Sequence, residues 1–174
     1  MRPTKLQQLL QKAKSGDGDI QYEIAKRYLD GYGRRKNVKK GMYWLKKSAK
    51  EKFTKAIFRL GELYWCGSGK ILENQEVALA LFEEAAFAGL VKAQYLLGAI
   101  YATDPKRIDL IRSANWYTMA SNNGDAEASY NLGLMYLNGD GVTKDINNGV
   151  VLIEKAADAG FELAIQFLSE YLST

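Results

Sequence analysis

The chain repeats itself with a period of about 36 residues, and this periodicity restricts its possible folds more than any other feature. Five positions mark the period, at spacings of 36, 37, 35 and 36 residues: Gly16, Lys52, Gly89, Gly124 and Gly160. A period of this length indicates an array of small structural units. Each unit is too small to bury its hydrophobic face alone, so neighbouring units must share a core.

The residues that follow each marker predict a helix. Apolar residues recur four, eight and twelve positions after the marker, and these offsets trace one helical face. The position nine residues after the marker is small in the four full units: Ala25, Gly61, Gly98 and Gly133. Glycine inside a helix costs roughly 1 kcal/mol relative to alanine. Its recurrence therefore predicts that a second helix crosses very close to this point.

A second helix follows in each unit. Glycine-rich turns end the first helix in units one, two and four: Asp30-Gly-Tyr-Gly, Cys66-Gly-Ser-Gly and Asn138-Gly-Asp-Gly. A glycine just past the last periodic residue ends a helix by adopting a positive φ. Large residues then recur seven positions before the next marker: Leu45, Phe82, Tyr117 and Ile153. The third unit has Ala102-Thr-Asp-Pro-Lys-Arg in place of the glycine pair, so we expect a locally different loop there.

These patterns predict an all-α chain that forms a single repeat domain over residues 1–174. The expected parts are a capping helix, four helix pairs and a second capping helix, at residues 1–15, 16–51, 52–88, 89–123, 124–159 and 160–174.

Composition excludes several classes of chemistry. The chain has no histidine and one cysteine, Cys66, so Ser-His-Asp and Cys-His nucleophiles, His-ligated zinc or haem and internal disulfides cannot form. Gly67-Ser-Gly-Lys70 resembles part of a phosphate-binding loop, but Tyr64 and Ile71 occupy the places of its first glycine and its Ser or Thr. We interpret that segment as a helix-ending turn. No catalytic residue, metal or cofactor is predicted.

Apolar runs are too short for the roughly 20 residues that a membrane-spanning helix needs. The N-terminal segment lacks the continuous apolar core of a secretory signal. We therefore expect a cytoplasmic protein with no membrane partner, and we expect a monomer.

Charge is distributed unevenly along the chain. Residues 1–55 carry 16 Lys and Arg against 5 Asp and Glu, whereas residues 56–174 carry 8 against 15. The basic residues are densest between positions 34 and 55. Three interpretations stay open for this segment: a solvated outer surface, a site for an acidic protein partner, or contacts to the phosphates of a nucleic acid.

An aromatic residue recurs six positions after the marker, about 160° around the helix from the core leucine. Charged and apolar residues that vary between units share its face. We predict that this face binds a partner protein, because aromatic side chains dominate the energetics of protein interfaces. The predicted residues are Tyr22, Lys26, Phe58, Glu62, Trp65, Lys92, Tyr95, Glu127, Tyr130 and Leu134. In the alternative interpretation, the aromatic rings pack between adjacent helices as part of the repeat.

The fourth unit carries the clearest motif, Ala128-Ser-Tyr-Asn-Leu-Gly-Leu-Met-Tyr-Leu-Asn-Gly-Asp-Gly-Val, followed by Glu154-Lys-Ala-Ala-Asp-Ala-Gly. This pattern resembles the Sel-1-like repeat family, and it is similar to the tetratricopeptide pattern with longer units. The resemblance implies a right-handed α-solenoid of antiparallel helix pairs, with the first helices lining a concave groove. It also implies a scaffold or adaptor role, often in bacteria, and no reaction or cofactor. Some members carry paired cysteines that bridge helices, which this chain lacks.

We therefore expect a non-catalytic adaptor that recognises another protein through the groove. An alternative is a bacterial immunity protein or antitoxin that masks a toxin, and a further alternative is nucleic-acid binding through the basic segment.

Overall fold

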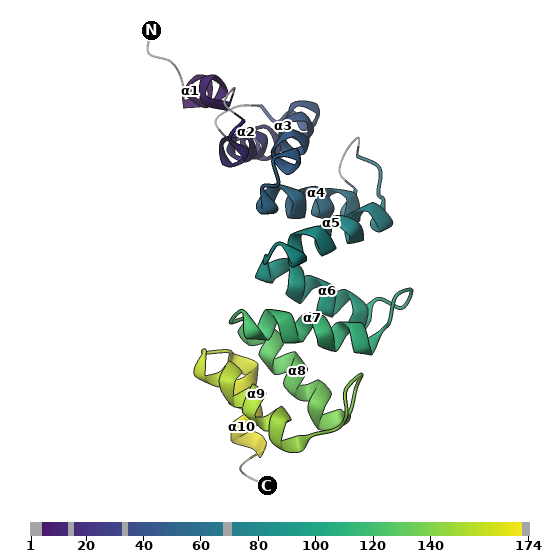
Figure 1. Cartoon of the computed structure of the whole chain (residues 1–174). Coiled ribbons are helices and arrows are strands. Elements are labelled where there is room, and N and C mark those ends of the chain that lie inside the picture. The colour runs from purple at the N-terminus through teal and green to yellow at the C-terminus, as the bar shows by residue number, and fades with distance from the viewer. Residues whose placement is uncertain (1–4, 14–15, 33–34, 68–70, 172–174) are drawn as a thin grey trace. The chain divides into compact units, whose positions relative to one another are not determined.

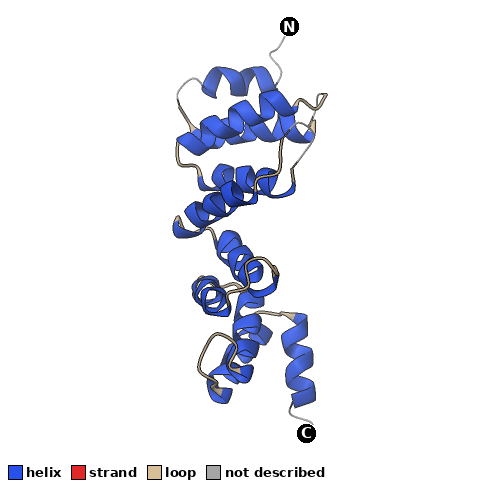
Figure 2. Ribbon diagram, turned by 90° about the vertical axis from the view of Figure 1, so that its right-hand side faces the viewer, coloured by secondary structure: helices blue, strands red, loops and turns tan. Residues whose placement is uncertain are grey.

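The computed structural model describes residues 5–13, 16–32, 35–67 and 71–171, and these ranges contain helices and loops with no β-strand. The all-α prediction is confirmed (Figures 1 and 2). The helices are α1 (Lys5–Lys12), α2 (Gly18–Asp30), α3 (Val38–Lys50), α4 (Thr54–Cys66), α5 (Gln75–Phe87), α6 (Val91–Thr103), α7 (Leu110–Asn122), α8 (Ala126–Asn138), α9 (Ile146–Asp158) and α10 (Glu162–Tyr171). The predictions made for Gly33, Arg34 and residues 68–70 lie outside the described residues.

The helices divide between two compact halves of the chain, Met1–Leu90 and Val91–Thr174, and each half contains two of the four repeats. From here on the halves are called unit 1 and unit 2, and the 36-residue units of the sequence are called repeats. In the first unit α2 pairs with α3 and α4 pairs with α5, while α1 packs on α2. In the second unit α6 pairs with α7 and α8 pairs with α9, while α10 packs on α9. Each pair lies within one of the four predicted repeat ranges. Within the described part of the chain, each helix is too short or too polar to cross a lipid bilayer.

The five markers of the sequence period share one backbone conformation. Each has a φ between 59° and 88°, in the left-handed region: Gly16, Lys52, Gly89, Gly124 and Gly160. The first four markers lie just before the first helix of a pair, and Gly160 lies just before α10, so each marks a turn of the chain. Lys52 is the one residue other than glycine with a positive φ among the residues that the structure describes.

Within each pair, a backbone hydrogen bond to the recurring tyrosine joins the two ends of the loop between the helices. The second helix begins after a capping residue: Asn37, Asn74, Asp109 or Asp145. The backbone N–H of this cap donates, over 2.8 to 2.9 Å, to the carbonyl oxygen of a tyrosine in the preceding helix: Tyr28, Tyr64, Tyr101 or Tyr136. The cap's side chain accepts a backbone N–H from the first turn of the second helix, which satisfies a donor that the helix leaves unpaired.

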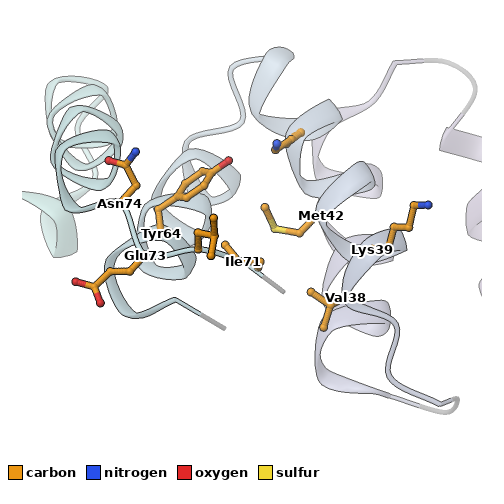
Figure 3. A pocket seen from close by; sticks show the side chains of 9 residues that line it. Val38, Lys39, Met42, Tyr64, Ile71, Glu73 and Asn74 are labelled. Atoms are coloured by element: carbon orange, nitrogen blue, oxygen red, sulfur yellow. The ribbon is translucent and has the colours of Figure 1, made fainter. Parts of the chain in front are cut away.

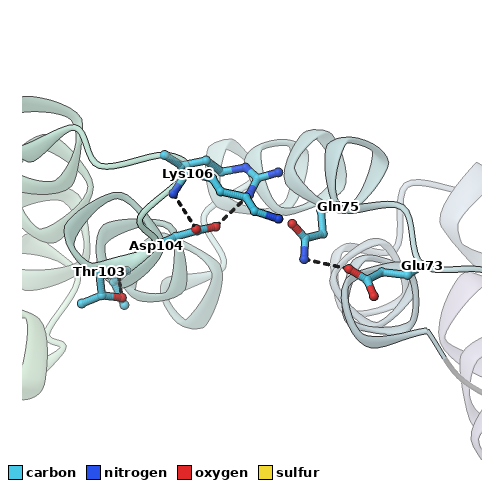
Figure 4. Close-up of polar contacts among 7 residues, drawn as sticks. Glu73, Gln75, Thr103, Asp104 and Lys106 are labelled. Atoms are coloured by element: carbon cyan, nitrogen blue, oxygen red, sulfur yellow. Dashed lines mark hydrogen bonds and ion pairs between the residues drawn. The ribbon is translucent and has the colours of Figure 1, made fainter.

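The third loop makes the same backbone bond but differs in its side-chain contacts, as its sequence predicts. Asp104 accepts the backbone N–H of Lys106 at 3.0 Å and the guanidinium of Arg107 at 2.7 Å (Figure 4). These bonds lower the pKa of the Asp104 carboxyl, because they favour its charged form. Hydrogen bonds to the Asp104 side chain thus stand in this loop where the other loops have a glycine turn.

The helices of a pair cross at the predicted small residues. A Cβ built on Gly61 would lie 2.6 Å from the Phe82 ring, and one on Gly98 would lie 2.6 Å from the Tyr117 ring. Gly133 meets Ile153 at the same distance. Real Cβ atoms essentially never approach so closely, so a side chain at any of these positions would force the helices apart. The prediction of a close crossing is confirmed.

Candidate protein-binding faces

The first helices of unit 1, α2 and α4, are linked by an arginine. Arg59 on α4 pairs with Glu62 at 3.0 Å and with Asp30 of α2 at 3.7 Å. Tyr22 on α2 is half-buried, with its ring centroid 5.4 Å from that of Phe53, and the Nζ of Lys26 lies 5.8 Å from the Tyr22 ring. Tyr22 and Lys26 therefore lie on α2 and Glu62 lies on α4, and the ion pair of Arg59 with Asp30 links these two helices.

Burial raises the pKa of the Tyr22 hydroxyl. The charge of Arg59 lowers it and the charge of Glu62 raises it, so both groups act on this tyrosine. Sequence reasoning missed Arg59 and Asp30, although Arg59 stands three positions before Glu62, a spacing that places two side chains on one helix face.

The other two predicted residues of unit 1 face the second helix of their own pair. Phe58 is only 5 % exposed, and its ring centroid lies 5.4 Å from that of Phe82. Trp65 is half-buried, 6.0 Å from the same ring. Because Gly61 lies between them on α4, the Phe82 ring fits into the gap.

The expectation that Phe58 lies on an accessible face is therefore wrong. Helix α4 packs against both α3 and α5, so two of its sides are covered. A residue opposite the core leucine on such a helix meets a second neighbour rather than solvent.

In unit 2, the first helices α6 and α8 are joined by a direct side-chain bond. The hydroxyl of Tyr95 on α6 donates to a carboxylate oxygen of Glu127 on α8. Burial, followed by this bond, raises the pKa of Tyr95. The Tyr95 ring also lies 5.8 Å from that of Tyr117, whose pKa burial and the charge of Glu127 raise to about 12. Lys92 is exposed at the start of α6.

The last two predicted residues lie against the C-terminal helix. Tyr130 is half-buried, with ring centroids 5.4 Å from Phe161 and 6.4 Å from Phe167. Leu134 packs on the cluster formed by Ile153, Ala156 and Ala164. These contacts support the alternative interpretation for part of the set, in which the aromatic residues also stabilise the repeat.

The predicted residues thus fall into local groups. Tyr22 lies beside Lys26 on the same helix and near Glu62 on the next first helix. Tyr95 bonds to Glu127 on the next first helix. All of the predicted residues except Phe58 keep exposed or half-buried surface. We refer to the two sets as the first-helix face of unit 1 (Tyr22, Lys26, Asp30, Arg59, Glu62) and the first-helix face of unit 2 (Lys92, Tyr95, Glu127, Tyr130).

Five lysines of the basic segment lie on α3, where they are exposed or half-buried. Its lysines lie over aromatic rings: Lys40 Nζ is 5.8 Å from the Tyr28 ring and Lys47 Nζ is 5.4 Å from the Trp44 ring. Their charged ends stay in solvent while their methylene stems cover apolar surface.

Comparison with known proteins places the repeats in a family. The sequence model described as "Sel1 repeat" matches residues 19–53, 54–89, 91–125 and 126–161. The chain is 31 % identical over 91 residues to the rat protein named DAP3-binding cell death enhancer 1, covering 52 % of this chain and 18 % of that protein. It is 33 % identical over 93 residues to the Arabidopsis thaliana ERAD-associated E3 ubiquitin-protein ligase component HRD3B, covering 53 % of this chain and 15 % of that protein.

A solved structure extends the likeness over most of the chain. The protective antigen c5321 of uropathogenic Escherichia coli, described as displaying an SLR fold, is 31 % identical with a TM-score of 0.87. The alignment covers 95 % of this chain and 36 % of that one. The alignments therefore span about a sixth of the curated relatives and about a third of the solved protein. Sel1 repeat proteins are in general protein-interaction adaptors. The predicted α-solenoid is confirmed, and the chain belongs to the Sel1 repeat family.

Proposed function

We propose that the chain is a non-catalytic adaptor that binds a partner protein through the first-helix faces of its repeats. The observation that carries this proposal is the arrangement of a half-buried tyrosine beside charged groups of the next first helix. Tyr95 bonds to Glu127 in unit 2, and Tyr22 is acted on by Arg59 and Glu62 in unit 1.

Such a face suits protein recognition. A tyrosine held by a neighbouring helix offers a large contact area and loses little conformational entropy on binding. The charged residues around it differ between the two units, so they supply specificity without altering the shared core. The printed names of two relatives agree with this role, since one is called DAP3-binding and the other a ligase component.

Site-specific photo-crosslinking in the native host tests the proposal. A photoreactive amino acid is placed at Lys26, Lys92 or Glu127, which are exposed on the first helices. The matched controls are Asn115 and Val151, which are exposed on the second helices α7 and α9. We expect an adduct with one partner protein from the first-helix positions and none from the controls. Adducts obtained only at Asn115 and Val151 would contradict the proposal.

A further inference from the structure

A pocket lies in unit 1 beside the first-helix face, because Val38 and Ile71 of its lining also border a small hollow with Asp30 and Arg59 of that face. It has a volume of about 600 Å³ and opens between α3 and the segment that leads from α4 into α5 (Figure 3). Its lining residues are Val38, Lys39, Met42, Lys46, Tyr64, Ile71, Leu72, Glu73 and Asn74. This volume is in the range of sites that bind small molecules or side chains of a partner.

The floor of the pocket is apolar and held in place. Val38, Met42, Tyr64 and Ile71 are partly buried and pack on the hydrophobic core of unit 1. Figure 3 shows Met42 projecting from α3 toward Tyr64 and Ile71 on the opposite wall. The carbonyl of Tyr64 accepts the backbone N–H of Asn74 at 2.8 Å, which ties that wall to α4.

One large apolar side chain at the pocket is left in solvent. Leu72 is 85 % exposed, and the apolar residues Val38, Met42 and Ile71 line the same pocket. Burying Leu72 under an incoming apolar side chain would remove this apolar surface from water, which favours binding.

The pocket's charge is of one sign along α3. That helix carries five lysines and no acidic residue: Lys39, Lys40, Lys46, Lys47 and Lys50. Among the residues that the structure describes, no carboxylate lies within ion-pairing distance of Lys39 or Lys46. Glu73, the acidic residue of the lining, accepts the Gln75 amide at 2.8 Å and keeps its negative charge (Figure 4). Two lysines against one carboxylate leave the lining with a net positive charge, which favours an anionic ligand.

The positions of Lys39 and Lys46 also fix the distance between the two positive charges that a ligand would meet. Lys39 and Lys46 are seven residues apart on α3, which places them about 10 Å apart along the helix axis, with Met42 between them. Three residues of an extended peptide span about the same distance.

We propose that this pocket is a docking site for an extended segment of a partner protein in which two acidic residues, about three positions apart, flank a large apolar residue. The acidic groups pair with Lys39 and Lys46, and the apolar side chain enters between Met42 and Leu72. The apolar lining favours a protein segment over a nucleic acid, whose phosphates would use the lysines and leave the floor empty. This site adjoins the first-helix face of unit 1 but contains none of its residues, and it does not depend on the role of that face.

A random peptide library displayed on phage tests the proposal with the full-length protein. We expect the selected peptides to share two Asp or Glu residues about three positions apart with a Leu, Ile, Phe or Trp between them. One selected peptide is then synthesised with a fluorescent label, and its dissociation constant is measured by anisotropy. Selection of no such motif would overturn the proposal.

Two variants and a control locate the binding. We expect Leu72→Ser and the double variant Lys39→Glu/Lys46→Glu each to weaken the peptide about tenfold or more, since tenfold corresponds to about 1.4 kcal/mol. Lys50→Glu, an exposed charge reversal on the same helix outside the pocket, should change the affinity less than about twofold. All four substituted positions are exposed, so thermal melts should show a folded protein.

Two results would overturn the proposal. In one, the peptide binds Leu72→Ser and the double lysine variant as tightly as the original protein. In the other, a labelled oligodeoxynucleotide displaces the peptide at about 200 mM salt, where weak phosphate contacts are lost, and binds the Leu72→Ser variant unchanged, which would assign the lysines to phosphate contacts. Photo-crosslinking at Lys92 should be unaffected by either variant, so failure of this site is distinguishable from failure of the proposed adaptor role.

Discussion

At the residue scale, one marker of the repeat is strained. Lys52 has a φ of 59°, whereas the four other markers are glycines with φ between 83° and 88°. The left-handed region costs an L-residue about 1 to 2 kcal/mol. The Nζ of Lys52 pairs with Glu84 at 2.7 Å, but both groups are largely exposed, and pairs of this kind contribute little to stability.

We therefore expect Lys52→Gly to stabilise the protein by about 1 kcal/mol, because glycine adopts this conformation without steric cost. Chemical denaturation measures the change. Lys52→Ala is the control, since it removes the ion pair and keeps the strained backbone, and it should not be more stable than the original protein. Equal stabilisation by both variants would show that the lysine side chain, rather than its φ, is unfavourable.

A second residue-scale feature is a buried glutamine. Gln21 is fully buried, and among the described residues neither atom of its amide group has a hydrogen-bond partner. The equivalent residue of the second repeat is Ile57, which is equally buried. An unpaired polar group inside a protein costs about 1 to 3 kcal/mol.

Gln21→Ile is therefore expected to raise the free energy of unfolding by about 1 kcal/mol or more. The matched variant is Gln94→Ile at the same position of the third repeat, where the Gln94 Oε1 accepts the Asn123 amide at 2.9 Å. That variant breaks a bond and should gain less. If the two substitutions change the melting temperature equally, Gln21 is satisfied in solution.

At the element scale, each helix pair is held by a small residue facing a large one. The pairs are Ala25 with Leu45, Gly61 with Phe82, Gly98 with Tyr117 and Gly133 with Ile153. Alanine faces leucine in the first pair, whereas glycine faces an aromatic ring in the second and third pairs. Glycine also faces isoleucine in the fourth pair, where the Gly149 carbonyl oxygen lies 2.8 Å from the built Cβ. The second pair can therefore be exchanged for the first as a test of the crossing.

Gly61→Ala should destabilise the protein by about 1 to 3 kcal/mol, because the new Cβ would overlap the Phe82 ring. Adding Phe82→Leu recreates the first pair and should recover part of this loss. A double-mutant cycle from denaturation curves gives the coupling between the two positions. Strictly additive effects would mean that the two residues do not compete for the same space.

A further prediction concerns the tyrosines of unit 2. Burial and the bond to Glu127 raise the pKa of Tyr95, and the pKa of Tyr117 is raised to about 12. In the unfolded chain both hydroxyls lose their protons near pH 10. The unfolded state therefore binds fewer protons above that pH, so the stabilisation is complete below about pH 10 and is lost as pH rises toward 12.

Denaturation at several pH values between about 9 and 11 should show this fall in stability. Tyr95→Phe/Tyr117→Phe removes both titrating groups and should flatten the curve, although it also removes the bond to Glu127. A slope unchanged in the double variant would assign the alkaline loss to other groups.

At the scale of the whole molecule, two compact units each contain two helix pairs and one flanking helix. The basic residues gather in the first unit, where α3 has five lysines and no acidic residue. Because the whole chain has a net charge of only +4, its attraction to polyanions arises from this one region.

We accordingly expect weak binding to nucleic acid without sequence preference. A gel-shift series should show an affinity that falls by about a thousandfold or more between 50 and 200 mM salt, as expected when several lysines contact phosphates. Lys39→Glu/Lys46→Glu should bind nucleic acid more weakly than the original protein at the same salt concentration. A submicromolar complex that survives about 200 mM salt would contradict a function based on protein partners.

The amino-acid sequence alone determined the repeat, its helix pairs and the close crossing at Gly61, Gly98 and Gly133. These features follow from periodicity within some 36 residues, where helix geometry is local and the same pattern occurs four times. The markers of the period also coincide with the turns, because a left-handed residue is needed at each of them.

Only the tertiary structure decided which side chains remain accessible. Phe58 lies opposite the core leucine of α4, yet it is buried because a second helix covers that side. The Tyr95–Glu127 bond and the pocket between Met42 and Ile71 join residues about 30 positions apart. Such contacts depend on how neighbouring helices pack, which the periodicity of a single helix does not specify.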